Sequence, residues 1–288
     1  MAANVEDGPS DPRPALWSRK QWMAFSIGGV LTAAAIGGIW AISGGSIGVP
    51  AAILNPLIVV LIPTQSWISF RQLRNAKVPP KPPLNLYRTS LLLTWMMGLL
   101  VFAVLADRDT DLRHVGFRFG NNQKFLGWCL VLGVGSAGIG AVFHWLKVRR
   151  WLPTGPGDSA FFPKTRSEKL AALFLVAPSV GFCEELVYRG YLITQIQDRF
   201  KGCPTAASLF VSCLFFGLAH MDQGGSAVLQ TFVTGALWAW PLLHSGTIFP
   251  SMVIHGLYVA VALTWLGPKP ASSAKGPART STSPSQTS

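Results

Sequence analysis

Two adjacent glutamates, Glu184 and Glu185, and an arginine four residues later, Arg189, lie inside an apolar run of the sequence, residues 170–192. At the centre of a membrane-spanning helix, an ionised side chain costs about 2.5–3.5 kcal/mol, and three independent ones would cost on the order of 8 kcal/mol. The other ten acidic residues lie outside such runs. Intramembrane ionisable groups are functional by default, so this segment is the first candidate for chemistry.

Helical spacing gives the three groups different environments. Glu185 and Arg189 are four residues apart with the acid first, which is the favourable order for an ion pair on a helix. Glu184 is rotated from Glu185 by about 100° and is left outside that pair. A desolvated carboxylate has a raised pKa and suits a general base near neutral pH. The alternative interpretation is a purely structural cluster of buried charges.

Two histidines in later apolar runs could complete a reactive site. His220 follows Phe216 by four residues, and His255 lies in the last run. Glutamate and histidine can bind a divalent metal such as zinc, with Glu184, His220 and His255 as ligands, or they can activate water with no cofactor. Both routes lead to hydrolysis, and the H-E-x-x-H motif of soluble zinc proteases is absent. We assign no role to the other three histidines, His114, His144 and His244.

The composition places these residues in an integral membrane protein. The chain has 288 residues, of which 50% are hydrophobic and only 12% charged, and its mean hydropathy is +0.38. Soluble domains carry about 25% charged residues. The apolar runs predict an all-α, polytopic fold with about eight membrane-spanning helices. Their expected ranges are Trp22–Ile42, Val49–Phe70, Thr89–Ala106, Phe125–Leu146, Leu170–Leu192, Pro204–His220, Ala227–Leu243 and Ile248–Leu266.

The net charge of +12 indicates membrane orientation rather than nucleic-acid binding, because the basic residues cluster in short segments between the apolar runs. With the N-terminus inside, the inner segments hold 17 basic residues and the outer segments 6. The positive-inside rule then predicts that both termini are cytoplasmic. The segment 107–124 is the exception, since it carries four basic and three acidic residues on the outer side and is expected to follow the membrane interface.

Low-complexity tails and one misleading motif complete the organisation. Residues 1–21 and the Ser/Thr/Pro-rich residues 268–288 are expected to be disordered, leaving N-terminal spans with an interfacial loop over 22–124 and a core over 125–267. Gly133, Gly135 and Gly138 match G-x-G-x-x-G, but they lie midway along an apolar run. We interpret them as small residues for helix packing rather than a dinucleotide site.

In this setting the chain resembles the CAAX-processing and bacteriocin-processing (CPBP) intramembrane proteases. Residues 183–190 resemble their E-E-x-x-x-R-G motif, residues 216–220 their F-x-x-x-H motif, and residues 232–255 their final pair of helices. The resemblance covers roughly residues 125–266. It implies a site opening toward the cytoplasm in which Glu184 activates water, His220 assists it, Glu185 and Arg189 hold the site together, and His255 stabilises the oxyanion.

The resemblance also implies an endopeptidase acting on a membrane-anchored protein or peptide, with a prenyl group as one expected anchor. The expected location is the cell membrane, or the endoplasmic reticulum membrane in a eukaryote. The family is described as metalloproteases, while its prenyl-protein branch looks able to work without a metal, the mechanism we favour. The chain departs from the family's H-x-x-x-N motif, because Val259 stands four residues after His255 and offers no hydrogen-bond donor. The neighbouring Tyr258 is one possible substitute.

Two other functions compete with a protease. A catalytically weak relative could act as a membrane scaffold or an immunity-type protein, and the loss of one oxyanion donor, typically worth about 2.7–4 kcal/mol, would favour that outcome. A proton-coupled transporter could use the two glutamates as relay groups. The halves of the sequence show no inverted repeat with paired broken helices, which argues against transport.

Overall fold

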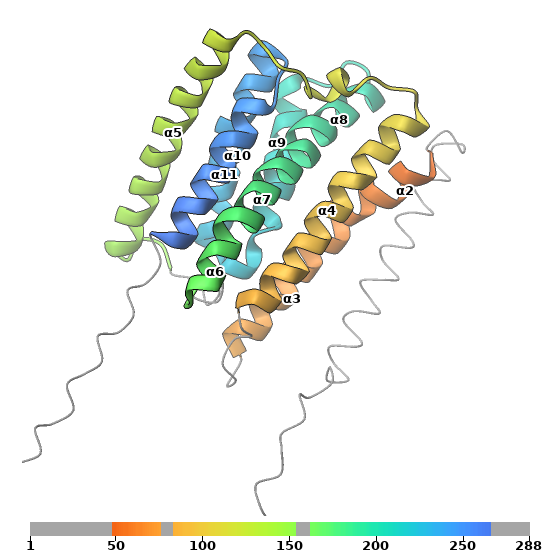
Figure 1. The fold of residues 1–288 in the computed structure, drawn as a ribbon. Helices are drawn as coiled ribbons and strands as arrows, with labels where there is room; N and C mark the ends of the chain where they lie inside the picture. The colour runs from red at the N-terminus through yellow and green to blue at the C-terminus, as the bar shows by residue number, and fades with distance from the viewer. Residues whose placement is uncertain (1–47, 76–82, 154–161, 266–288) are drawn as a thin grey trace, which may run out of the picture.

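The computed structural model describes residues 48–75, 83–153 and 162–265, and every regular element in these ranges is a helix (Figure 1). The all-α prediction is confirmed for this part of the chain. In chain order the elements are α2 (Val49–Pro56), η1 (Leu57–Leu61), α3 (Ile62–Asn75), α4 (Pro83–Asp107), η2 (Leu112–Val115), α5 (Asn122–Val148), α6 (Arg166–Ala171), η3 (Ala172–Val176), α7 (Ala177–Glu184), η4 (Glu185–Leu192), α8 (Ile193–Arg199), α9 (Thr205–Leu218), η5 (Met221–Gln223), α10 (Gly225–Ser245) and α11 (Phe249–Thr264).

Five continuous helices in the described ranges are long and apolar enough to cross a bilayer, and they support a multi-pass membrane protein. They cover Val49–Arg74, Leu84–Asp107, Asn122–Val148, Arg166–Arg199 and Gly225–Ser245. The predicted sixth and eighth spans form α9 and α11, which have only 14 and 16 residues. The first predicted span, Trp22–Ile42, and both tails lie outside the described residues. The count of eight and the cytoplasmic termini therefore stay predictions.

The second predicted span continues beyond Phe70 to Asn75, and two of its three prolines bracket a change of helix type. Pro56 ends α2, the π-helical η1 follows, and Pro63 lies at the start of α3. Proline has no N–H to donate and crowds the preceding turn, so a local π segment is a physical way to keep the helix continuous. These helices pack on the rest of the bundle, since Leu54 shares one hydrophobic cluster with Leu186 and Trp238.

The fifth predicted span lies at the centre of the bundle, where α6, η3, α7, η4 and α8 join into one helix of 34 residues (Figure 1). It begins with a capping box, in which the Thr165 hydroxyl accepts from the Glu168 backbone N–H and the Glu168 carboxylate accepts from the Thr165 N–H. The π-helical η4 carries the E-E-x-x-x-R-G motif from its second glutamate onward and is buried along its whole length. Such π segments occur frequently at functional sites.

Close contact between α7 and α11 depends on glycine. A Cβ atom built on Gly181 would lie 2.5 Å from the carbonyl oxygen of Met252 and 2.6 Å from the backbone nitrogen of Gly256. Both neighbours are backbone atoms, which cannot move aside as a side chain can. Gly181 therefore lets α11 approach the central helix closely, and this approach carries His255 to the acidic motif.

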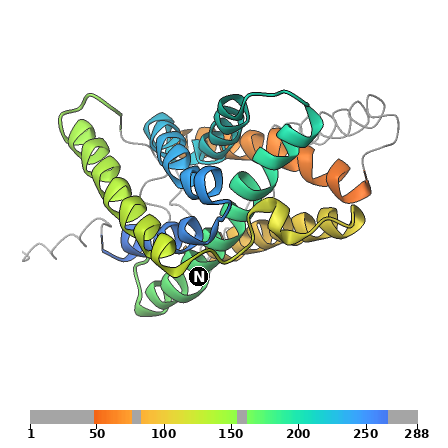
Figure 2. The same ribbon diagram turned by 90° about the horizontal axis from the view of Figure 1, so that it is seen from above.

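α5 lies at the edge of the bundle, beside α10 and α11 (Figure 2). Gly133, Gly135 and Gly138 all fall inside this uninterrupted helix, with no preceding strand in the described residues, so the dinucleotide interpretation is excluded. A Cβ on Gly135 would lie 2.7 Å from the Leu237 side chain, which supports a packing role at this position. Gly138 instead faces open space.

Candidate active site

The buried carboxylate of Glu185 is the centre of a charged cluster. Arg189 Nη1 lies 3.2 Å from Glu185 Oε1, and the ring Nδ1 of His255 lies 2.8 Å from the same oxygen. Glu185 and Arg189 are completely buried, and His255 is 3% exposed. The predicted ion pair between Glu185 and Arg189 is confirmed. The contact between Glu185 and His255 adds a partner that sequence spacing alone could not reveal.

Glu184 has a different environment from its neighbour. Its Oε2 atom lies 3.8 Å from His255 Nε2, too far for a hydrogen bond, and has no hydrogen-bond partner among the described residues. Its side chain keeps 15% exposure, whereas that of Glu185 has none. Two adjacent carboxylates thus contact opposite nitrogens of one imidazole ring. In the described residues each keeps an Oε2 atom without a hydrogen-bond partner. Glu185 is held through Oε1 by a cation and a hydrogen bond, and Glu184 is the one whose side chain keeps some exposure.

Aromatic rings enclose the arginine. The Arg189 guanidinium carbon lies 4.0 Å from the centre of the Phe216 ring and 5.7 Å from that of Trp238. Its Nε donates to the Gly235 carbonyl oxygen at 3.4 Å, and a Cβ at position 235 would lie only 2.8 Å from Nη2. Cation–π attraction therefore partly replaces the hydrogen bonds that this buried guanidinium lacks. Gly235 provides the space for it.

Trp238 holds the His255 ring in place by stacking on it. Its ring stacks on His255 with centroids 4.1 Å apart and an interplanar angle of 28°. The indole N–H donates to Ser136 Oγ of α5 at 2.9 Å, and the Trp238 carbonyl accepts from Ser251 Oγ at 2.5 Å. Sequence reasoning missed Trp238 and Ser136, because one of 11 tryptophans in an apolar run carries no distinguishing signal.

His220 follows the last turn of α9 and belongs to the same aromatic cluster. Its Nδ1 lies 2.9 Å from the Phe216 carbonyl oxygen and must carry the proton of that hydrogen bond. The Phe216 ring contacts both histidines, with centroid distances of 4.9 Å to His220 and 5.9 Å to His255. The structure thus brings all five predicted site residues into one region, although no hydrogen bond joins His220 to Glu184 in the described part of the chain.

The predicted metal ligands do not form a metal-binding arrangement. In the described ranges no group of three or more His, Cys, Asp or Glu side chains could hold a metal ion. Glu184, His220 and His255 are among these residues. The Nδ1 contacts of the two histidines leave each Nε2 free, so it is the spacing of the three side chains that lacks a metal-binding arrangement. Their arrangement does not fit a metal, so we derive no step through one.

Val259 and Tyr258 occupy different surroundings from the expected oxyanion donor. Val259 packs against an apolar cluster that contains Tyr87, Ala172 and Val176. A hydrogen-bond donor at position 259, where the family motif has asparagine, would therefore face this apolar cluster. The Tyr258 hydroxyl accepts from Gln230 Nε2 at 2.8 Å, and its ring meets Trp238 edge-on at 5.7 Å, so Tyr258 reaches the site only through Trp238.

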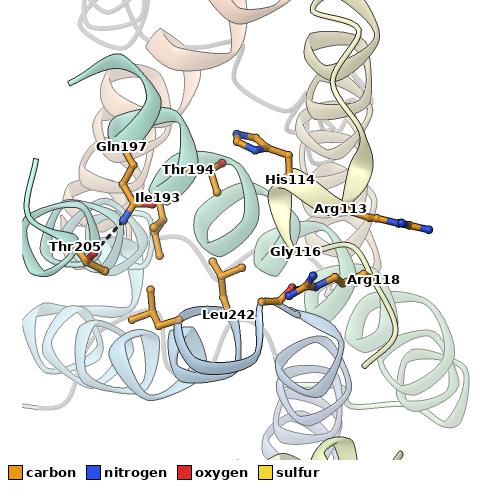
Figure 3. A pocket seen from close by; sticks show the side chains of 11 residues that line it. Arg113, His114, Gly116, Arg118, Ile193, Thr194, Gln197, Thr205 and Leu242 are labelled. Atoms are coloured by element: carbon orange, nitrogen blue, oxygen red, sulfur yellow. Dashed lines mark hydrogen bonds between the residues drawn. The ribbon is translucent and has the colours of Figure 1, made fainter. Parts of the chain in front are cut away.

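Two surface pockets lie away from these residues, where η2, α8, α10 and the start of α5 meet. The first, of about 430 Å³, is lined by Ile193, Thr194, Gln197, Leu242 and the segment around His114 (Figure 3). The second, of about 570 Å³, lies between α5 and α10. None of the five predicted site residues lines either pocket.

Residues 166–261 match the model of one family, described as Rce1-like, type II CAAX prenyl endopeptidase Rce1-like. The matched segment runs from α6 into α11 and contains all five predicted site residues. The family resemblance is therefore confirmed for this segment, while α5 and everything before it fall outside the match. No curated protein and no solved structure matches the chain significantly.

Proposed function

Because residues 166–261 are Rce1-like, we propose that the protein is an intramembrane endopeptidase that hydrolyses a peptide bond of a membrane-anchored, prenylated substrate. The observation that carries the proposal is the difference between the two adjacent glutamates. Glu185 is completely buried, neutralised by Arg189 and held by His255, whereas the Glu184 side chain keeps 15% exposure. The Oε2 atom of each glutamate has no hydrogen-bond partner among the described residues. This arrangement leaves Glu184 as the base.

The proposed reaction needs one water molecule beside Glu184. The carboxylate removes a proton from the water, whose oxygen forms a bond to the carbonyl carbon of the substrate, and the carbonyl electron pair moves onto its oxygen. When the intermediate collapses, the C–N bond breaks and Glu184 delivers the same proton to the leaving nitrogen. The products are a carboxylic acid and an amine, and Glu184 returns to its starting state.

The imidazole of His255 supports the developing charge. Its Nδ1–H donates to Glu185, so Nε2 is directed at the Glu184 side of the site. A second proton on Nε2 makes the ring an imidazolium, whose N–H can donate to the oxyanion. His220 has its Nδ1 proton committed to Phe216, and its Nε2 lone pair can accept from the attacking water.

The location follows the same proposal. The five long apolar helices support a multi-pass membrane protein, and we propose that the site opens to the cytoplasm, at the end where the central helix begins. In a bacterium this is the cell membrane, and in a eukaryote the endoplasmic reticulum membrane. Both would present a protein anchored by a prenyl chain within reach of Glu184.

Cleavage of a prenylated peptide by the purified full chain in detergent tests the proposal. Glu184→Gln should reduce the cleavage rate at least about 100-fold, the lower range for loss of a general base, without lowering the melting temperature. Asp109→Asn makes the same acid-to-amide change at an exposed position and should cleave normally. A strong chelator should leave the wild-type rate unchanged.

Two results would contradict the mechanism. Normal cleavage by Glu184→Gln would remove this residue from the reaction. Failure of the folded wild type to cleave any prenylated or membrane-anchored peptide would favour the scaffold role instead.

A further inference from the structure

The segment 107–124 departs from the charge pattern of the rest of the chain, and the structure shows where its basic side chains lie. Arg108 donates to Gln195 Oε1 at 2.6 Å. Arg113 and Arg118 line the first pocket at this end of the bundle (Figure 3), and Arg118 and Lys124 line the second. No acidic residue lines either pocket within the described residues. The pockets therefore attract anions.

The two pockets differ in how many cationic groups remain available. In the first pocket, His114 Nε2 lies 2.7 Å from Asp198, and Arg113 lies 3.8 Å from Asp111. Figure 3 shows the Arg113 side chain directed away from Leu242. Arg118 lines both pockets, and the second pocket adds Lys124, which is exposed in the first turn of α5. The second pocket is therefore the better anion site.

Arg118 is held in a fixed orientation at the second pocket. Its Nε donates to the Gly246 carbonyl at 2.8 Å and its Nη2 to the Ser245 carbonyl at 3.1 Å, at the C-terminal end of α10. The Arg118 carbonyl in turn accepts from Thr247 Oγ1 at 2.6 Å. A guanidinium has five N–H donors, so three remain for an anion. A cation fixed in this way loses little conformational entropy when it binds a phosphate.

The rest of the second pocket combines aromatic and apolar side chains with polar ones, among them Asn121, Ser245 and Thr247. Phe119 is 82% exposed at its edge. Trp128, whose indole N–H donates to Ser245 Oγ at 2.8 Å, and His244, whose ring stacks on Trp240, form a wall. Tryptophans are enriched at the level of the lipid headgroups, and the half-buried Trp128 and the 48% exposed Trp240 lie near this end of α5 and α10. The pocket thus lies at the depth of a lipid phosphate rather than in open water.

An apolar surface continues from the pocket into the membrane. On the side of α5 that carries Lys124, seven and eighteen residues further along the helix, Val131 is 52% and Val142 is 54% accessible. Only 11% of the most apolar stretch of α5 is buried inside the protein. Acyl chains bound beside this helix would have their phosphate next to Arg118 and Lys124.

We propose that the pocket between α5 and α10 binds an anionic phospholipid, with its phosphate between Arg118 and Lys124 and its acyl chains along α5. Basic pockets between membrane helices bind anionic headgroups in the same way. The site is separate from Glu184 and does not depend on the proposed protease activity. It also gives a reason for basic residues in a segment that the charge pattern places outside.

Native mass spectrometry of the purified full chain in detergent tests the proposal. Equal amounts of phosphatidylglycerol and phosphatidylcholine with the same acyl chains are added, and the retained lipid is counted. We expect one phosphatidylglycerol to be retained in preference to phosphatidylcholine. Lys124→Gln should weaken its binding about five-fold, the usual effect of one basic side chain at a membrane surface. Arg74→Gln removes an exposed charge from the last turn of α3 and is the matched control, expected to bind as wild type.

Three results would overturn the proposal. Equal retention of the two lipids would show that the pocket does not select charge. Equal weakening by Lys124→Gln and Arg74→Gln would show a diffuse effect of net charge. Complete displacement of phosphatidylglycerol by excess inorganic phosphate would identify a site for a free anion, in which the apolar surface of α5 has no part.

Discussion

Glu185 Oε1 lies 2.8 Å from His255 Nδ1, although the two residues are 70 positions apart in the chain. This contact joins the central helix to α11 and decides the orientation of the imidazole ring. Glu184, the next residue in the sequence, meets the opposite ring nitrogen at 3.8 Å. A single histidine thus separates two carboxylates of the same motif into a structural role and a proposed reactive one.

Removing the charge of Arg189 alone should destabilise the protein more than removing the charges of Glu185 and Arg189 together. Arg189→Gln leaves the Glu185 carboxylate buried without its cation, which typically costs about 3–5 kcal/mol. Glu185→Gln together with Arg189→Gln removes both charges and should recover much of that loss. Thermal melting of the two variants in detergent measures the difference. If Arg189→Gln has the same melting temperature as the wild type, the cation is not what holds Glu185 in place.

Gly181→Ala should separate the two helices that form the site. The new Cβ would lie 2.5 Å from a backbone atom of Met252 and 2.6 Å from one of Gly256, which is so close that one of the two helices must shift. We expect a lower melting temperature and, if the site cleaves peptides, a lower rate, since His255 moves with α11. Gly138→Ala is the matched control, because its Cβ enters open space and alanine favours a helix by about 0.5–1 kcal/mol over glycine. Equal melting of both variants would contradict the close-packing argument.

Val259→Asn tests whether a side chain at position 259 reaches the site, as the family motif implies, or packs in the apolar cluster, as the structure shows. The resemblance predicts that an amide at this position donates to the oxyanion and raises turnover about 10-fold or more. The structure instead places Val259 against Ala172 and Val176, where an unpaired amide typically costs about 1–3 kcal/mol. We expect a lower melting temperature and no gain in the cleavage rate. A faster rate with unchanged stability would show that the side chain does reach the site.

The contacts of the site that lie within one helix could be predicted from the sequence, and the contacts between helices could not. The pairing of Glu185 with Arg189 follows from spacing within one helix, as does the separate environment of Glu184. The stacking of Trp238 on His255 depends on how α10 and α11 pack, and no periodicity in an apolar run encodes that. The same limit applies to the fold. The apolar runs located the helices but predicted α9 and α11 to be longer than they are, because burial in a bundle favours short apolar helices as well as long ones.

The stability of the connection between α9 and α10 should depend on pH through Asp222. Burial raises the pKa of this carboxyl to about 6 from 3.8, against the opposing effect of backbone hydrogen bonds. The folded state therefore holds the proton more tightly than the unfolded chain. The stabilisation is present below about pH 4 and is lost as the pH rises through 6. At about 1.4 kcal/mol per pKa unit, the loss amounts to about 3 kcal/mol.

Asp222→Asn removes this ionisation and should raise the melting temperature at pH 7 to 8 while changing it little at pH 4. The gain should appear between about pH 4 and pH 6, because that interval separates the two pKa values of the wild-type carboxyl. Asp109→Asn, at an exposed position, is the control and should show no such gain. A gain of the same size at pH 4 and pH 8 would contradict the assignment, since it would then come from the amide itself and not from relief of a buried charge.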